Sequence, residues 1–256
     1  MRWFVGCSLG WMLVGCGGDA SKESTASSPD IAAPSPPALT TATALPVDGI
    51  VAEQAAPYAG CTATAEAGDP SFDTEIWYDA YGWMVWFDAD YYTESVHYDR
   101  AEGMVVGATV AWEQPASGYG PCDEDFVAGT REVTYDEHQY VVHEAEVQVD
   151  RCGDTHTFDR VHDLVYEEGL LTERTATERN QVVVERYDEC GLRTNWRLTN
   201  ERGNTLSEQF ENTYEPGSCL PQRVKSAGYS MLFEDGRIVA DFVGNQQVFS
   251  YTYSCP

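Results

Sequence analysis

Residues 140–150 read Tyr-Val-Val-His-Glu-Ala-Glu-Val-Gln-Val-Asp, so apolar and polar side chains alternate along this segment. Successive side chains of a β-strand point to opposite faces, and the period of two therefore predicts a half-buried strand. The apolar positions are expected to be buried and the polar ones to face water. The apolar set is Val141, Ala145, Val147 and Val149, and the polar set is Glu144, Glu146, Gln148 and Asp150.

The same alternation continues elsewhere, most clearly at the C-terminal end. Residues 247–255 place Phe249, Tyr251, Tyr253 and Cys255 on one face, and Val248, Ser250, Thr252 and Ser254 on the other. No segment of twelve or more residues has a convincing helical period. The sequence thus predicts an all-β domain, an antiparallel meander of repeated hairpins that forms a twisted or curled sheet stapled by disulfides.

A loose unit recurs through the domain: an aromatic residue, an acid, a short spacer and a glycine. We expect the aromatic residue to end a strand, the acid to cap the turn, and the glycine to supply a positive φ. Copies begin at Tyr78, Tyr98, Tyr166, Tyr187, Tyr214 and Phe233, and Tyr135-Asp136 and Phe158-Asp159 look like copies that lost the glycine.

The two full matches, Tyr78-Asp79-Ala80-Tyr81-Gly82 and Tyr187-Asp188-Glu189-Cys190-Gly191, resemble the YD-repeat family of Rhs-type bacterial proteins. In that family, successive hairpins form one long antiparallel sheet that curls on itself. The resemblance supports the meander architecture. A β-meander that repeats aromatic, acid and turn glycine for purely local reasons is the alternative.

The N-terminus carries an export signal. Met1-Arg2 precedes an apolar run from Trp3 to Val14, which is too short to span a bilayer. The run ends in Leu13-Val14-Gly15-Cys16, which resembles the lipobox of bacterial lipoproteins. A rival site at Cys7 leaves too little apolar sequence before it. The resemblance implies a signal peptide at 1–15 and acyl chains on Cys16 that anchor the protein to a lipid bilayer.

The lipoprotein resemblance also implies a cell-envelope location. Gly17 follows the lipidated cysteine where an Asp retains some lipoproteins in the inner membrane, so the outer membrane is favoured. Residues 16–57 are rich in Ser, Thr, Ala and Pro, and such segments bury too little surface to fold. We therefore expect a lipidated N-terminus and disordered tether over 16–57, and a β-repeat domain over 58–256.

Charge excludes one class of partner. The 256 residues include 42 acidic and 15 basic ones, which gives a net charge of −27. Such a chain cannot neutralise phosphates, so nucleic acid is excluded as a partner. A glycan or an envelope protein remains open.

Six cysteines follow the lipidation site, and no Cys-x-x-Cys pair suggests a metal site. An even number in an exported domain predicts three disulfides. The cysteines recur with the hairpins, so we expect disulfides between neighbouring turns at one end of the sheet, paired sequentially along the chain. The candidates are Cys61, Cys122, Cys152, Cys190, Cys219 and Cys255.

Catalytic motifs are absent from the sequence: it has no Gly-x-Ser-x-Gly, no His-Glu-x-x-His and no phosphate loop. His156 and His162 flank Asp159, but six residues of strand separate the two histidines too far to share a zinc ion. We expect surface histidines and a non-enzymatic protein. No cofactor is predicted; calcium is the metal that clustered acids suggest, with Asp88, Asp90, Asp123 and Asp125 as weak candidates.

An aromatic cluster offers the one candidate ligand platform. Rings on one sheet face can stack on a sugar or an apolar ligand, although the same rings can also form the core of the first hairpins. Trp83 and Trp86 alternate along one segment, so one of them is expected to face out. The cluster consists of Trp77, Trp83, Trp86, Tyr91 and Tyr92.

The sequence therefore predicts a membrane-anchored extracytoplasmic lipoprotein of non-enzymatic binding or envelope-structural type. A carbohydrate- or ligand-binding lipoprotein that uses the aromatic sheet face is the alternative.

Overall fold

The computed structural model describes residues 50–256, apart from 68–72, 90, 119–120, 122–124 and 179–180. A short helix, α1 (Ile50–Ala55), and a 3-10 turn, η1 (Ala56–Tyr58), precede seventeen strands. The strands are β1 Thr62–Ala67, β2 Thr74–Tyr78, β3 Met84–Ala89, β4 Tyr92–Ala101, β5 Met104–Glu113, β6 Phe126–Tyr135, β7 Val141–Asp150, β8 Thr155–Glu167, β9 Leu170–Glu178, β10 Gln181–Tyr187, β11 Arg193–Thr199, β12 Thr205–Gln209, β13 Glu211–Tyr214, β14 Pro221–Lys225, β15 Tyr229–Glu234, β16 Arg237–Val243 and β17 Gln246–Ser254.

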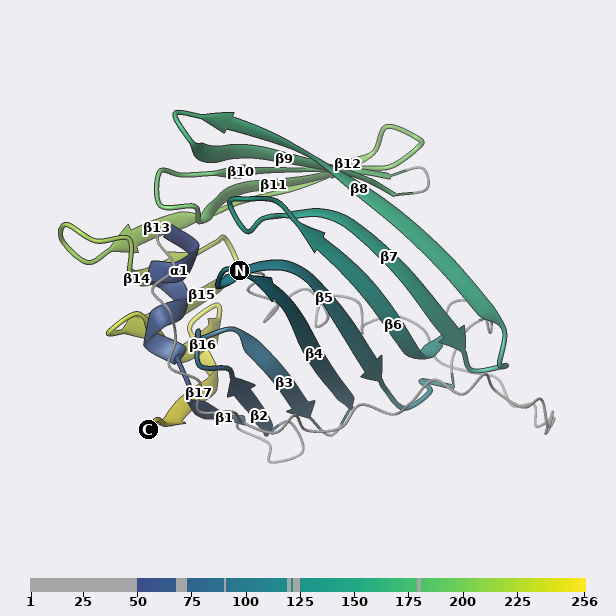
Figure 1. Cartoon of the computed structure of the whole chain (residues 1–256), viewed down its shortest axis with the longest axis horizontal. Helices are drawn as coiled ribbons and strands as arrows, with labels where there is room; N and C mark the ends of the chain where they lie inside the picture. The colour runs from purple at the N-terminus through teal and green to yellow at the C-terminus, as the bar shows by residue number, and fades with distance from the viewer. Residues whose placement is uncertain (1–49, 68–72, 90, 119–120, 122–124, 179–180) are drawn as a thin grey trace.

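The predicted antiparallel meander is confirmed, and it curls until its two ends meet. Nearly every strand pairs with its neighbour in the chain, and the first strand, β1, also pairs with the last, β17, from Thr62–Ser254 to Ala67–Phe249. At Phe210 the chain passes from β12, which pairs with β11, to β13, which pairs with β14. The long strands β4 to β8 form a curved wall, and β13 to β17 lie at one end (Figure 1).

In three of the repeated units the acid caps its hairpin turn, as the sequence predicts. In the β2–β3 turn, Asp79 Oδ1 accepts hydrogen bonds from the backbone N–H groups of Tyr81 and Trp83, both at 2.9 Å. Asp136 and Asp188 do the same in the β6–β7 and β10–β11 turns. These are Asx turns, in which a short carboxylate replaces a backbone acceptor. The cap explains why an acid stands at this place in each of these turns.

The second oxygen of each capping aspartate ties the turn to an adjacent element. Arg100 Nη2 lies 2.6 Å from Asp79 Oδ2. Tyr166 donates to Asp136 Oδ2, and both Asn212 and Tyr214 donate to Asp188 Oδ2. One carboxylate therefore closes its own hairpin and fixes the spacing to the next one.

Glycine completes the turn where the backbone is left-handed. Gly82 has φ +82°, and a Cβ placed on it would lie 1.8 Å from the carbonyl oxygen of Ala55 in α1, so no other residue fits. The unit beginning at Tyr135 keeps the turn without glycine, because Gln139 adopts φ 66°. The assignment of Phe158-Asp159 as a further copy is wrong, since both residues lie within the continuous strand β8.

Two further turns of the same kind are present, and the aromatic-acid-glycine pattern does not predict them. Asp150 caps the β7–β8 turn through Cys152 and Asp154, and Asn200 caps the β11–β12 turn through Arg202 and Asn204. Val149 precedes Asp150 and Thr199 precedes Asn200, so neither turn begins with the aromatic residue of the repeated unit. The spacing Asx-x-x-Gly alone would have revealed them.

Helix α1 packs against the end of the sheet where these aromatic-acid turns gather (Figure 1). Val51 and Ala55 form a buried cluster with Trp83 and Val105. Gln54 Nε2 donates to the carbonyl of Cys190 at 2.7 Å, and Tyr58 is fully buried in the main core. Residues of the segment 50–57, which belongs to the predicted tether, thus pack against the sheet.

Disulfides are present, but the sequential pairing is wrong. Cys61 bonds to Cys255, and Cys190 bonds to Cys219. The first pair follows from the curl of the sheet, because β1 and β17 lie side by side. The second joins the β10–β11 and β13–β14 turns, as expected of a staple between neighbouring turns. Cys152 is also disulfide-bonded, and Cys122 lies outside the described residues.

The prediction for the faces of β7 is confirmed for Val141 and Val149, which are buried, but it is wrong for other residues of the strand. Glu144 and Asp150 are each 2 % exposed, whereas Val147 is 37 % exposed. Glu144 lies on the inner face of the curled sheet. On this face, side chains that are paired from strand to strand form a row across β4 to β8. The row consists of Val96, Val110, Arg131, Glu146 and Phe158. Alternation identifies the two faces of a strand, but it does not say which one the curling sheet encloses.

Candidate functional site

The inner face holds a buried charged cluster centred on Glu144 of β7. His162 Nε2, from β8, lies 2.7 Å from Glu144 Oε1, and the two side chains are only 1 % and 2 % exposed. Arg160 and Arg131 approach the same carboxylate at 3.7 Å each. Arg131 also lies 4.0 Å from Glu94. A buried carboxylate is tolerable in such a place only because positive partners surround it.

A second group of charges lies on β9, β10 and β11 of the same face. Glu185 accepts hydrogen bonds from Arg174, Arg193 and Tyr187. Burial opposes the ionisation of Glu185, but the two guanidinium groups outweigh it, and the pKa of Glu185 is lowered. The group therefore stabilises the fold above the ordinary Glu pKa, and this contribution is lost as the pH falls through the lowered value.

The inner carboxylates are thus engaged with partners from neighbouring strands. Glu146 accepts a 2.9 Å hydrogen bond from Trp112 Nε1, and Glu94 accepts one from Tyr92. These inner carboxylates hold neighbouring strands in register. Because their oxygens already accept hydrogen bonds or face arginines, few carboxylate oxygens remain free to contact a substrate. We read the inner cluster as the framework of the domain.

Asp241 of β16 is the exception, because it is buried without a cation among the described residues. It is 1 % exposed, Tyr251 donates to Oδ2 at 2.8 Å, and Oδ1 has no hydrogen-bond partner in this part of the chain. Burial raises the pKa of Asp241, while the nearby hydroxyl groups of Tyr251 and Tyr229 oppose the rise.

Asp241→Asn is expected to raise the free energy of unfolding by about 1 kcal/mol at pH 7, because it removes a buried charge. The folded pKa lies above the unfolded one, so the cost of the carboxylate grows as the pH rises through the folded pKa. At pH 3, where both states hold the proton, the difference should vanish. Urea unfolding at both pH values measures it, and an equal loss of stability at both would contradict this account.

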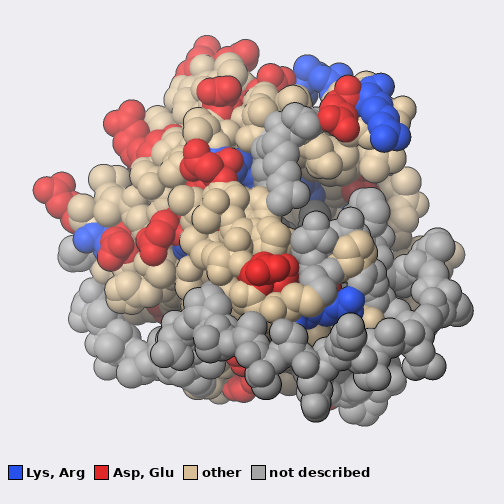
Figure 2. All heavy atoms as spheres, turned by 90° about the vertical axis from the view of Figure 1, so that its right-hand side faces the viewer, with Lys and Arg blue, Asp and Glu red and all other residues tan. Residues whose placement is uncertain are grey.

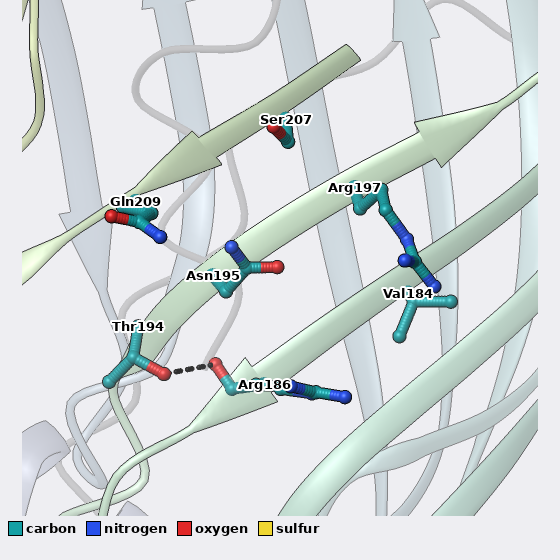
Figure 3. Close-up of a pocket in the computed structure, with 7 residues that line it drawn as sticks. All are labelled: Val184, Arg186, Thr194, Asn195, Arg197, Ser207 and Gln209. Atoms are coloured by element: carbon teal, nitrogen blue, oxygen red, sulfur yellow. Dashed lines mark hydrogen bonds between the residues drawn. The ribbon is translucent and has the colours of Figure 1, made fainter. Parts of the chain in front are cut away.

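The exposed, outer face carries a shallow cavity of about 480 Å³ on β10, β11 and β12. We call it the outer groove, and Figure 3 shows its seven lining side chains on the three neighbouring strands. Nearly all of them offer hydrogen-bond donors, and none is acidic or aromatic. They are Val184, Arg186, Thr194, Asn195, Arg197, Ser207 and Gln209.

Sheet register places the groove residues beside one another. Arg186 pairs with Asn195, Asn195 with Gln209, and Arg197 with both Val184 and Ser207. Arg186 and Arg197 are therefore diagonal neighbours, which puts the two residues roughly 7–8 Å apart. The two guanidinium groups can reach one ligand between them.

The groove is unusual in so acidic a chain. Acidic side chains are scattered over the face seen in Figure 2, whereas basic ones gather in only a few places. Arg186 is paired to Glu173 at 3.1 Å, but its side chain remains 65 % exposed. Arg197 is exposed and forms no ion pair or side-chain hydrogen bond with any residue that the structure describes. Its charge is available to a ligand.

The predicted aromatic platform is not gathered on one exposed surface. Trp83 and Trp86 are 8 % and 5 % exposed, so the expectation that one of them faces out is wrong. Trp83 packs against the rings of Tyr98 and Tyr135 in the inner core, and Trp77 lies beside Trp86. Tyr92 stacks on Trp112 inside the curl, and Tyr91 is half-buried. A turn before Met84 and a register shift after Trp77 disturb simple alternation here.

The weak calcium candidates are not brought together by the part of the chain that the structure describes. Asp125 is 4 % exposed, and its oxygens accept hydrogen bonds from the backbone N–H groups of Ser117 and Gly118. Asp88 is exposed and accepts a bond from Thr93. Asp90 and Asp123 lie outside the described residues, within which no group of three or more potential ligands is arranged for a metal ion.

The histidines find separate partners. His156 and His162 both lie on β8 with no turn between them, as the sequence spacing implied. His156 meets Asp150, and Asp159 meets His143 instead of either of them. His162 is buried, so its assignment to the surface is wrong. Its buried partner comes from another strand, which sequence spacing does not reveal.

The lipidation candidate Cys16 lies outside the described residues. Within them, no helix combines the length and the hydropathy of a transmembrane span. The chain matches no protein-family model and no curated protein.

Proposed function

We propose that this chain is a lipid-anchored binding protein of the bacterial cell envelope, a non-enzymatic lipoprotein that displays a rigid curled sheet. The observation that carries the proposal is the segment Leu13-Val14-Gly15-Cys16 behind its apolar run. The disulfides Cys61–Cys255 and Cys190–Cys219 support it, because such bonds persist in oxidising compartments. Gly17 favours the outer membrane as the anchoring site.

Binding is favoured over catalysis by the way the charges are used. The inner carboxylates Glu144 and Glu185 hold arginine and histidine partners, whereas the donors of the outer groove face solvent. Sugar binding through the aromatic residues is the weaker alternative, because Trp83 and Trp86 are buried. A glycan or another envelope component is the partner that we expect, apart from the bilayer itself.

Metabolic labelling with an alkyne analogue of palmitate tests the anchor. The wild-type chain and Cys7→Ser should both take up the label, and Cys16→Ser should lose it, because Cys16 is the residue that we expect to carry the acyl chains. Cys7→Ser is the matched control, since it alters a cysteine in the same apolar segment. Labelling that survives in Cys16→Ser would refute the assignment.

A further inference from the structure

The outer groove combines two kinds of recognition chemistry. Arg186 and Arg197 present planar guanidinium forks, which match a carboxylate through paired hydrogen bonds. Asn195 and Gln209 add amides, and Thr194 and Ser207 add hydroxyl groups, all of which can exchange bonds with sugar hydroxyls. Thr194 already donates to the backbone carbonyl of Arg186 at 3.2 Å (Figure 3), which leaves its oxygen free to accept.

Charge placement points to an anionic ligand. Two arginines stand diagonally on adjacent strands, so an anion between them would relieve the repulsion of their like charges. Glu173 neutralises Arg186 only in part, and no described acid pairs with Arg197. The chain has 42 acidic residues, yet none of them lines the groove. The groove therefore differs in charge from the rest of this acidic protein.

We propose that the outer groove binds acidic saccharides, sugars that carry a carboxylate among their hydroxyl groups. The guanidinium groups of Arg186 and Arg197 take the carboxylate, and the amides of Asn195 and Gln209 take the neighbouring hydroxyls. The proposal rests on the proposed envelope binding function and names its ligand class. Since no aromatic ring lines the groove, recognition depends on hydrogen bonds and charge instead of stacking.

Titration calorimetry of the full chain in detergent micelles tests the proposal, with trigalacturonic acid as the probe and its methyl ester as the neutral match. The acid should bind and the ester should bind at least tenfold more weakly, because esterification removes the charge. Arg197→Gln should weaken binding of the acid by about tenfold, the loss expected for a charge-assisted hydrogen bond. Arg202→Gln, which makes the same charge change in the β11–β12 turn outside the groove, should bind like wild type.

Equal binding of acid and ester, equal losses in Arg197→Gln and Arg202→Gln, or no binding of the acid would overturn the proposal. Competition by inorganic phosphate at the same concentration as trigalacturonic acid would overturn it too, since the groove would then recognise charge alone. None of these results bears on lipidation at Cys16, which the palmitate label reports separately.

Discussion

Replacing Cys61 and Cys255 together with alanine is expected to lower the free energy of unfolding by about 5 kcal/mol. The two residues are separated by 194 positions, so their disulfide closes almost the whole folded domain into one loop. In the chain-entropy treatment, a longer loop restricts the unfolded chain more, and the folded state gains accordingly. Urea unfolding of the purified, oxidised proteins measures the loss.

The Cys190–Cys219 pair provides the matched control. Its loop spans 29 positions, and its removal should cost roughly 3.5 kcal/mol by the same treatment. The more informative result is which of the two double variants loses more stability. In the chain-entropy treatment this ranking depends only on the lengths of the two loops. A larger loss from the Cys190/Cys219 double variant would contradict the closure of the sheet through β1 and β17.

Glu144→Gln is the second large effect, with an expected loss of about 3–5 kcal/mol at pH 7. Glutamine keeps the size of the side chain but removes the charge that holds His162, Arg131 and Arg160. Arg131, Arg160 and His162 then lose the anionic partner that they share, and the oxygen and amide nitrogen that replace it are almost fully buried. Chemical unfolding at neutral pH, followed by tryptophan fluorescence, gives the difference.

Glu173→Gln is the comparison for the buried pair. Glu173 meets Arg186 at 3.1 Å, yet the two side chains are 34 % and 65 % exposed. Exposed pairs contribute about 0–1 kcal/mol, so this variant should unfold close to wild type. If both glutamate variants lose the same amount, the inner cluster is not the framework that we describe.

The class of fold could be predicted because its causes are local. Alternation in β7 and β17 sets the strands, and Asp79 and Asp188 close their turns through backbone bonds within four residues. Each of these signals lies within a few positions along the chain. The same locality explains why the Asx-x-x-Gly turns can be read from the sequence at all.

Closure and burial could not be predicted because their causes are distant. The partner of Cys61 is 194 positions away, and it becomes a neighbour only when the curl brings β17 to β1. Glu144 reads as a solvent-facing acid in its own strand, but arginines from β6 and β8 and a histidine from β8 make its burial possible. Arg186 and Arg197 likewise look like ordinary exposed charges until register sets them side by side.

One measurement tests the central claim most directly: the intact mass of the protein purified from membranes, before and after reduction and alkylation. We expect a chain that begins at Cys16 and carries a diacylglyceryl group and a further acyl chain. We also expect no alkylation of Cys61, Cys190, Cys219 or Cys255 until the disulfides are reduced. A mass that corresponds to an unmodified Cys16, or to free thiols without reduction, would contradict it.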